Sequence, residues 1–278
     1  MTPLSPFPLG LDLELISHLA TQSVPSSNPA RPLKFSTMTR ATDEAEHSAE
    51  MQLPYLHRLF QALCGGQPES SHPPLVPIMV GSTSPATEAA FGKLLAPYVA
   101  DPENVFVISS DFCHWGSRFA YTYYVAEADS PPVSDLSLPN GVHGPETASS
   151  GAAEELHKDP SLSRGRNLSA NEHPAKPKIH ESIAAVDRAC MCAIATGESE
   201  EFQKVVEETG NTVCGRHPIG VFMAAVEEVE KNRKEKGEDN TENAQGNGRF
   251  RFVRYERSGN VVSARDSSVS YVGAFAVL

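Results

Sequence analysis

Apolar residues recur every three or four positions in several segments of the chain, the spacing that places them on one face of a helix. Residues 47–65 show this pattern and end at a pair of glycines. The segment 84–100 also begins with Ser84 and Pro85, favoured residues for the cap and the first position of a helix. The same pattern predicts further helices over residues 179–197, 199–210 and 215–232.

Two short apolar runs, at residues 74–81 and 104–111, flank the helix predicted at 84–100. They have the length of strands, and a strand–helix–strand succession predicts parallel strands joined by a right-handed crossover. Two more runs, at 250–258 and 268–278, predict strands that close the chain. The sequence therefore predicts an α/β protein with a mixed sheet between layers of helices, a three-layer architecture.

Two stretches, at residues 126–178 and 231–249, are poor in large apolar residues and rich in small, polar or charged ones. Such a composition does not bury enough surface to offset the entropy lost on ordering. Because periodic segments resume after each stretch, we expect two disordered insertions within a single domain that spans residues 1–278.

The chain has a formal net charge of −12. This charge argues against a nucleic-acid partner, which clustered Lys and Arg would hold, and against docking on an anionic membrane. No apolar run approaches the roughly 20 residues that cross a bilayer. Five cysteines in 278 residues do not indicate a disulfide framework. We therefore expect a soluble protein of a reducing compartment, in the cytoplasm and also the nucleus.

The stretch SSDFCHWG carries the first candidate site. Asp111, Cys113 and His114 follow directly on a predicted strand, and ligands of open α/β sheets lie beyond the carboxyl ends of the strands. A histidine at this place can act as a general base or bind a metal. The alternative is structural, with His114 ending a loop and Trp115 filling the core. Position and composition leave both interpretations open.

A second group of polar residues lies where a loop becomes a predicted helix. These residues could line a site, but acidic residues also stabilise the amino terminus of a helix through its dipole. Without further information the structural explanation is favoured. The group consists of Asp43, Glu44, Glu46, His47 and Glu50.

The third candidate is the stretch NTVCGRHPIG, which opens another predicted helix. Cys214 lies beside the helix amino terminus and Arg216, both of which stabilise a thiolate. His217 adds a second potential ligand, and the alternative is a buried, inert cysteine. Cys190 and Cys192 point to different faces of their predicted helix, so joint metal binding by these two is not expected.

Taken together, these segments resemble the Memo family. The matching stretches include DEAEHSAEMQLPYL, FGKLLAPYVADPENVFVISSDFCHWGSRFAYTYY, IHESIAAVDRACM, NTVCGRHPIGV and DSSVSYVGAFAV. The second of these, from Phe91 to Tyr124, is long and specific. The expected insertions have no counterpart in the family pattern.

The resemblance implies a fold like that of the class III extradiol dioxygenases, which hold a non-haem iron. It implies that His114 handles protons, that His47 belongs to the same pocket wall and that Asp111 lies behind it. Cys214 takes the place of a metal-binding carboxylate. The resembling segments also bring four further residues to a substrate pocket: Glu46, Glu50, Arg216 and His217.

The resemblance also implies an iron or copper ion, metal-dependent redox chemistry and, in animal members, links to receptor tyrosine kinase signalling and cell motility. Members normally begin with a His-Ala-Gly-Tyr segment and a Ser-His-His segment, each of which supplies a histidine ligand. Neither segment occurs in this sequence. We therefore expect the domain to lack its N-terminal strands, and Cys214 to be left in an incomplete metal site, because functional sites need three or more ligands.

Two kinds of function stay open at this point. The first is a metal-dependent redox or ligand-binding site, weakly active or inactive in this chain, that takes a small molecule or a peptide. The second is a non-catalytic interaction or signalling protein, or an inactive fragment. The sequence does not identify the substrate, the metal or the oligomeric state.

Overall fold

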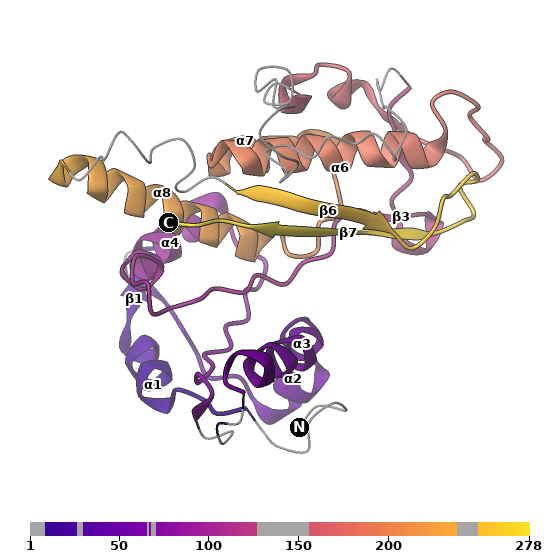
Figure 1. The fold of residues 1–278 in the computed structure, drawn as a ribbon. Helices are drawn as coiled ribbons and strands as arrows, with labels where there is room; N and C mark the ends of the chain where they lie inside the picture. Colours follow the sequence, from indigo (N-terminus) through magenta and orange to yellow (C-terminus); the bar gives the residue numbers. More distant parts are fainter. Residues whose placement is uncertain (1–8, 27–29, 66, 68–70, 127–155, 238–249) are drawn as a thin grey trace, which may run out of the picture. The chain divides into compact units, whose positions relative to one another are not determined.

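A computed structural model describes residues 9–26, 30–65, 67, 71–126, 156–237 and 250–278 of the chain (Figure 1). The chain divides into two compact units, residues 1–83 and residues 84–278, where the sequence predicts a single domain. Each unit combines helices with short strands, which confirms the α/β class.

The first unit is built from short helices and a two-stranded sheet. Asp12 begins the first helix by accepting a hydrogen bond from the backbone N–H of Leu15 (2.8 Å). The longest helix of this unit confirms the one predicted from apolar spacing between residues 47 and 65. The elements are α1 (Leu13–Thr21), α2 (Arg40–Ala45), α3 (Ser48–Leu63) and the antiparallel strands β1 (Ser23–Val24) and β2 (Leu33–Lys34).

The second unit contains a sheet with the strand order β3-β7-β6. Both strands predicted near the carboxyl end are present, as β6 (Arg251–Arg257) and β7 (Ser268–Phe275), and they pair antiparallel. The short strand β3 (His114–Trp115) pairs antiparallel with the start of β7. Helices α6 (Ile179–Thr196) and α7 (Ser199–Thr209) lie along one side of this sheet (Figure 1).

The two runs predicted to form parallel strands, 74–81 and 104–111, are not strands in the described part of the chain. Among the described residues of the first unit, the run at 74–81 pairs only through a parallel bridge between Leu75 and Leu11. Val105 stays 86% exposed. The prediction of a parallel strand–helix–strand unit is therefore wrong here, because apolar content alone does not supply the neighbouring strand that a ladder requires.

Four helices predicted for the second unit are confirmed. Ser84 begins α4 (Pro85–Val99) by accepting a hydrogen bond from the N–H of Thr87 (3.3 Å). Helix α4 packs against α8 (Arg216–Lys236), and they approach so closely that a Cβ on Gly92 would lie 2.7 Å from the Cβ of Ala224. The longest apolar stretch in any described helix is too short to span a membrane.

The described part of the first expected insertion is folded. Residues 156–178 include the 3-10 helices η4 (Leu156–Lys158) and η5 (Leu162–Arg164), and strand β5 (Arg166–Asn167) pairs with β4 (Tyr123–Tyr124). The expectation of disorder is wrong for these residues. Residues 127–155 lie outside the described residues.

Two kinds of contact hold residues 156–178 in place despite their low apolar content. Leu162 and Leu168 are buried, with 3% and 5% of their surface exposed. Two tyrosine hydroxyls donate to backbone carbonyls of this segment, from Tyr123 to Leu162 (2.6 Å) and from Tyr124 to Pro177 (2.8 Å). A few well-placed contacts therefore replace the apolar density on which the sequence prediction depended.

The second expected insertion begins inside a helix. Helix α8 continues to Lys236, so residues 231–236 are helical where the sequence predicts disorder. Basic residues occupy its last turn, where their positive charge stabilises the helix by interacting with the negative end of the helix dipole. Residues 238–249 of this expected insertion lie outside the described residues.

Candidate functional site

Two segments far apart in the sequence form the candidate site in the second unit. The first leads from residue 109 into β3, and the second precedes α8. The N–H of Cys214 donates to the carbonyl of Asp111 (3.2 Å). The N–H of His114 donates to the hydroxyl of Thr212 (2.7 Å), and that hydroxyl lies 3.0 Å from the carbonyl of His114, to which it donates. These bonds hold the two segments side by side.

The ring of His114 is oriented by two backbone carbonyls. Its Nδ1 lies 3.1 Å from the carbonyl oxygen of Phe112 and 3.1 Å from that of Thr212. Because carbonyl oxygens only accept hydrogen bonds, we assign the proton of the neutral ring to Nδ1. Nε2 then carries the lone pair, and it lies 3.6 Å from Oδ2 of Asp111. The ring is thus arranged to offer Nε2 to a metal or to a proton.

Cys214 is exposed and lies next to two sources of partial positive charge. Its Sγ accepts a hydrogen bond from the backbone N–H of Asp111 (3.0 Å), and the next residue caps the amino terminus of α8. Gly215 allows this close approach, because a Cβ at that position would lie 2.4 Å from the Cβ of Ser110 and 2.6 Å from the carbonyl oxygen of Ser109. Cys214 is therefore not the buried cysteine of the alternative interpretation.

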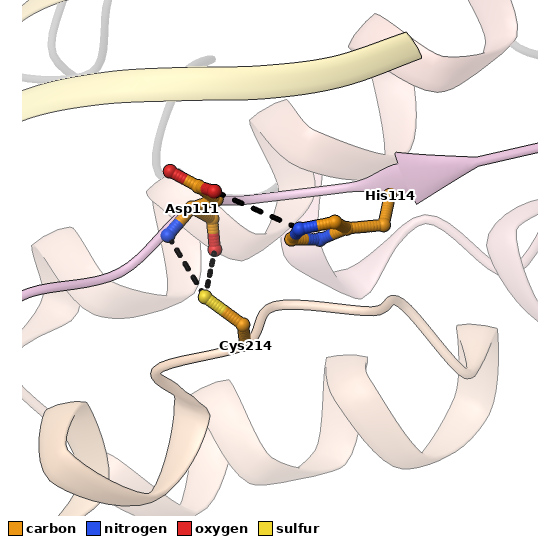
Figure 2. A group of neighbouring side chains, drawn as sticks. All are labelled: Asp111, His114 and Cys214. Carbon is orange, nitrogen blue, oxygen red and sulfur yellow. Dashed lines mark hydrogen bonds and ion pairs between the residues drawn. The ribbon is translucent and has the colours of Figure 1, made fainter. Parts of the chain in front are cut away.

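Asp111, His114 and Cys214 lie side by side, with the sulfur of Cys214 facing the backbone of Asp111 and the carboxylate of Asp111 facing the ring of His114 (Figure 2). Each offers one ligand atom, and these atoms all lie within 4.8 Å of one another. Atoms that bind one ion at about 2.0–2.3 Å stand roughly 3–4 Å apart around it. The separation of 3.6 Å between His114 Nε2 and Asp111 Oδ2 falls within that range. This pair is therefore at the spacing of two ligands of one ion, and the three ligand atoms together lie within 4.8 Å.

The donor set also fits the expected metals. Imidazole suits iron, copper and zinc, thiolate favours the softer ions among them, and a carboxylate adds a hard, charged ligand. The side chain of Asp111 is 43% exposed and Cys214 is exposed, so further coordination positions would open toward solvent. An open position is what separates a catalytic metal site from a closed structural one.

The other two residues of SSDFCHWG with possible chemistry belong to the core. Trp115 is fully buried, and its indole N–H donates to the carbonyl of Tyr123 (3.0 Å). Cys113 is also buried, and burial raises the pKa of its thiol well above the ordinary value. Burial likewise raises the pKa of Cys190 and raises that of Cys192 to about 11. These three thiols are therefore protonated packing residues at neutral pH.

The acidic group around His47 belongs to the first unit. The carboxylate of Glu46 accepts hydrogen bonds from the N–H of Ala49 (2.9 Å) and of Glu50 (3.1 Å) at the start of α3. Burial tends to raise the pKa of Glu46, but these bonds and one from Ser48 outweigh it, so the pKa lies below its ordinary value. Glu46 thus caps a helix, in agreement with the structural explanation. His47 and Glu50 are exposed, and their part in a pocket stays a prediction.

The two remaining pocket candidates lie at the start of α8. Nδ1 of His217 is 2.7 Å from Oε1 of Glu88, a buried residue of α4. The amide of Gln203 donates to the other carboxylate oxygen of Glu88 (3.2 Å). His217 therefore joins α8 to α4, whereas Arg216 is exposed.

Sequence reasoning missed Thr212, although it holds His114 at both its N–H and its carbonyl. The signal was its place two residues before Cys214, in a stretch already identified as a candidate. The hydroxyl of a threonine is common in any loop, however, and only the folded chain shows which backbone groups it contacts.

Comparison with known proteins relates the whole chain to one family. Residues 2–275 match the model of a family described as Memo-like protein. A MEMO1 family protein of Schizosaccharomyces pombe is 36% identical over 271 residues, which cover 97% of this chain and 69% of the relative. Protein MEMO1 of Homo sapiens is 32% identical over 244 residues, 87% of this chain and 60% of the relative. The chain thus spans about two thirds or less of the length of these relatives.

Proposed function

The chain belongs to the Memo-like family, and from this premise we propose that residues 84–278 carry a metal site for redox chemistry. Asp111, His114 and Cys214 are its ligands. One observation carries the proposal: the ligand atoms of these three residues lie within 4.8 Å of one another. Three convergent ligands meet the minimum for a functional metal site. The two absent histidine segments therefore do not by themselves remove metal binding.

The proposed metal is iron or copper, and it supplies one-electron redox chemistry when bound. His114 binds through Nε2, because its Nδ1 is engaged by two carbonyls. Cys214 binds as a thiolate, and the N–H of Asp111 supports the charge on its sulfur. The carboxylate of Asp111 completes the set and balances the positive charge of the ion. The proposed substrate is a small molecule that enters from the exposed side of Cys214.

The proposed fold relationship is with the class III extradiol dioxygenases. It is supported by the family resemblance and by the α/β character of both units. That relationship assigns proton transfer to His114. This role would take Nε2 out of the ligand set and leave only Asp111 and Cys214, so His114 is proposed as a ligand. A location in the cytoplasm, and also the nucleus, is part of the proposal.

A second candidate function is the binding of a peptide without catalysis. Exposed apolar side chains favour it, because exposed apolar surface commonly marks interaction sites. Val105 and Val107 are 86% and 48% exposed on an extended segment that has no assigned strand partner within the described residues. An extended peptide can add to such an unpaired edge through backbone hydrogen bonds.

Metal titration distinguishes the two candidates. Metal-free protein is titrated with Fe(II) without oxygen, with Cu(I), and with Co(II), whose spectrum reports thiolate ligation. We expect one equivalent of metal per chain and a loss of affinity of at least tenfold in Cys214→Ala, His114→Ala and Asp111→Asn. Cys64→Ala and His18→Ala remove residues of the same types from the first unit and serve as controls. Stoichiometric binding that survives all three site substitutions would contradict the proposal.

A further inference from the structure

We propose that Asp187 is the positioning residue of the Asp111–His114–Cys214 site. Its buried carboxylate fixes the two segments that carry the ligands relative to each other. The inference rests on the proposed function, because it assigns Asp187 a role toward the metal ligands that it does not itself contact.

Asp187 is fully buried in the middle of α6, among apolar neighbours such as Val186 and Ala189. An ionised carboxylate in such a place is strongly unfavourable unless several hydrogen bonds compensate for the lost water. Burial raises the pKa of Asp187, while hydrogen bonds from four neighbouring groups act in the opposite direction. The carboxylate is thus surrounded by donors, which indicates that its task is to accept hydrogen bonds.

One oxygen of this carboxylate joins the two ligand-bearing segments. Oδ1 accepts a hydrogen bond from the backbone N–H of Cys113 (3.2 Å) and from the side-chain amide of Asn211 (2.9 Å). Cys113 directly precedes His114, and Asn211 lies three residues before Cys214. A single buried atom therefore fixes the spacing between the backbone next to one ligand and the backbone near the other.

The second oxygen connects the same carboxylate to the sheet. Oδ2 accepts a hydrogen bond from the hydroxyl of Tyr255 on β6 (2.9 Å). This hydroxyl also lies 3.2 Å from the hydroxyl of Ser270 on β7. The two oxygens thus have separate tasks: Oδ1 holds the site segments, and Oδ2 anchors Asp187 to strands that carry no ligand.

This division of tasks allows matched substitutions. Asp187→Leu is close in size but removes both acceptors, so the N–H of Cys113 and the amide of Asn211 lose a partner. Asp187→Asn keeps an oxygen at the Oδ1 position, while the hydroxyls of Tyr255 and Ser270 can turn to accept from its amide. Tyr255→Phe removes a hydrogen bond to Oδ2 and leaves Oδ1 untouched. Asn211→Ala removes the arm toward Cys214, together with the contact of the same amide to the sulfur of Cys190 (3.3 Å).

The experiment measures Co(II) affinity and amide hydrogen exchange in the same variants. We expect Asp187→Leu and Asn211→Ala to weaken Co(II) binding by at least tenfold, as for residues that orient metal ligands. Asp187→Asn and Tyr255→Phe should stay within about threefold of the unsubstituted protein, since both keep the Oδ1 acceptor. In the metal-free protein, exchange should accelerate in residues 109–116 and 211–216 of Asp187→Leu, but not in α4, which serves as the internal reference.

Two results would overturn the role of Asp187. One is a folded Asp187→Leu protein that binds Co(II) as tightly as Tyr255→Phe; if the leucine variant does not fold, Asn211→Ala decides in the same way. The other is exchange that accelerates equally in all segments, which indicates a contribution to general stability alone. If the unsubstituted protein binds no Co(II), the proposed function fails, whereas hydrogen exchange still tests the positioning role.

Discussion

Substitution of Thr212 by valine tests how the site is held together. Valine has nearly the same shape, so the change removes the hydroxyl without creating a large cavity. Two hydrogen bonds are lost, one accepted from the N–H of His114 (2.7 Å) and one donated to its carbonyl (3.0 Å). Both bonds join the β3 segment to the segment before α8.

The expected loss of stability follows from these contacts. Each hydrogen bond contributes about 0.5–1.5 kcal/mol net, and an unpaired buried donor costs about 1–3 kcal/mol. The N–H of His114 is only partly buried, so we expect Thr212→Val to lower the free energy of unfolding by about 2–3 kcal/mol. The control Thr122→Val removes one hydrogen bond, from its hydroxyl to the carbonyl of Leu168 (3.0 Å), away from the site. Its expected loss is about 1 kcal/mol.

The assay is urea unfolding followed by circular dichroism, together with the Co(II) titration. A two-state transition gives the free energy of unfolding and its slope with urea, and an unchanged slope shows that the unfolded reference is the same. Thr212→Val should also weaken Co(II) binding by about tenfold, because it releases the backbone of a ligand, and Thr122→Val should not. Equal losses in the two variants, with unchanged metal binding in both, would refute the assignment of Thr212 to the site.

Two further predictions concern the fold around the site. Leu162→Ala should lower the free energy of unfolding by about 2–4 kcal/mol, since Leu162 is only 3% exposed. The exposed control Leu63→Ala should change it by less than about 0.5 kcal/mol, and an equally small effect of Leu162→Ala would mean that residues 156–178 do not pack on the rest of the second unit. Glu46→Gln should destabilise the protein by about 1 kcal/mol at pH 7, because it weakens the cap of α3. The pKa of Glu46 is lowered by folding, so its stabilisation is complete above its ordinary value of 4.5 and is lost as the pH falls through the lower folded value. The melting temperatures of Glu46→Gln and the unsubstituted protein should therefore converge at acid pH, and a constant difference between pH 7 and pH 3 would contradict the role of the charge.

The helices could be predicted because their signals are local. Ser84 and Pro85 mark the start of α4 within two residues, and apolar spacing marks α3 and α6. The strands predicted at 74–81 and 104–111 do not form, because a strand depends on a partner that the run itself does not encode. The composition of residues 156–178 predicts disorder, because composition does not show that Leu162 and Leu168 both become buried in the folded chain.

The sequence singles out residues of the candidate site, but it does not predict how they are arranged. Cys214 and His114 belong to motifs that a reader of the sequence can single out. The hydrogen bond from the N–H of Asp111 to the sulfur of Cys214 joins residues 103 positions apart, so only tertiary structure brings them together. Asp187 was hidden for a different reason. An acid inside an apolar helix is visible in the sequence, but its task depends on donors from other elements.

The pairing of β4 with β5 has an evolutionary consequence. Tyr123 pairs with Asn167, and Tyr124 pairs with Arg166, so the chain that leaves the core at one strand returns beside it at the other. The described residues that lead into β5 are themselves packed, and Leu162 is only 3% exposed. We therefore expect these residues and the two paired strands to change more slowly in evolution than exposed positions of the chain.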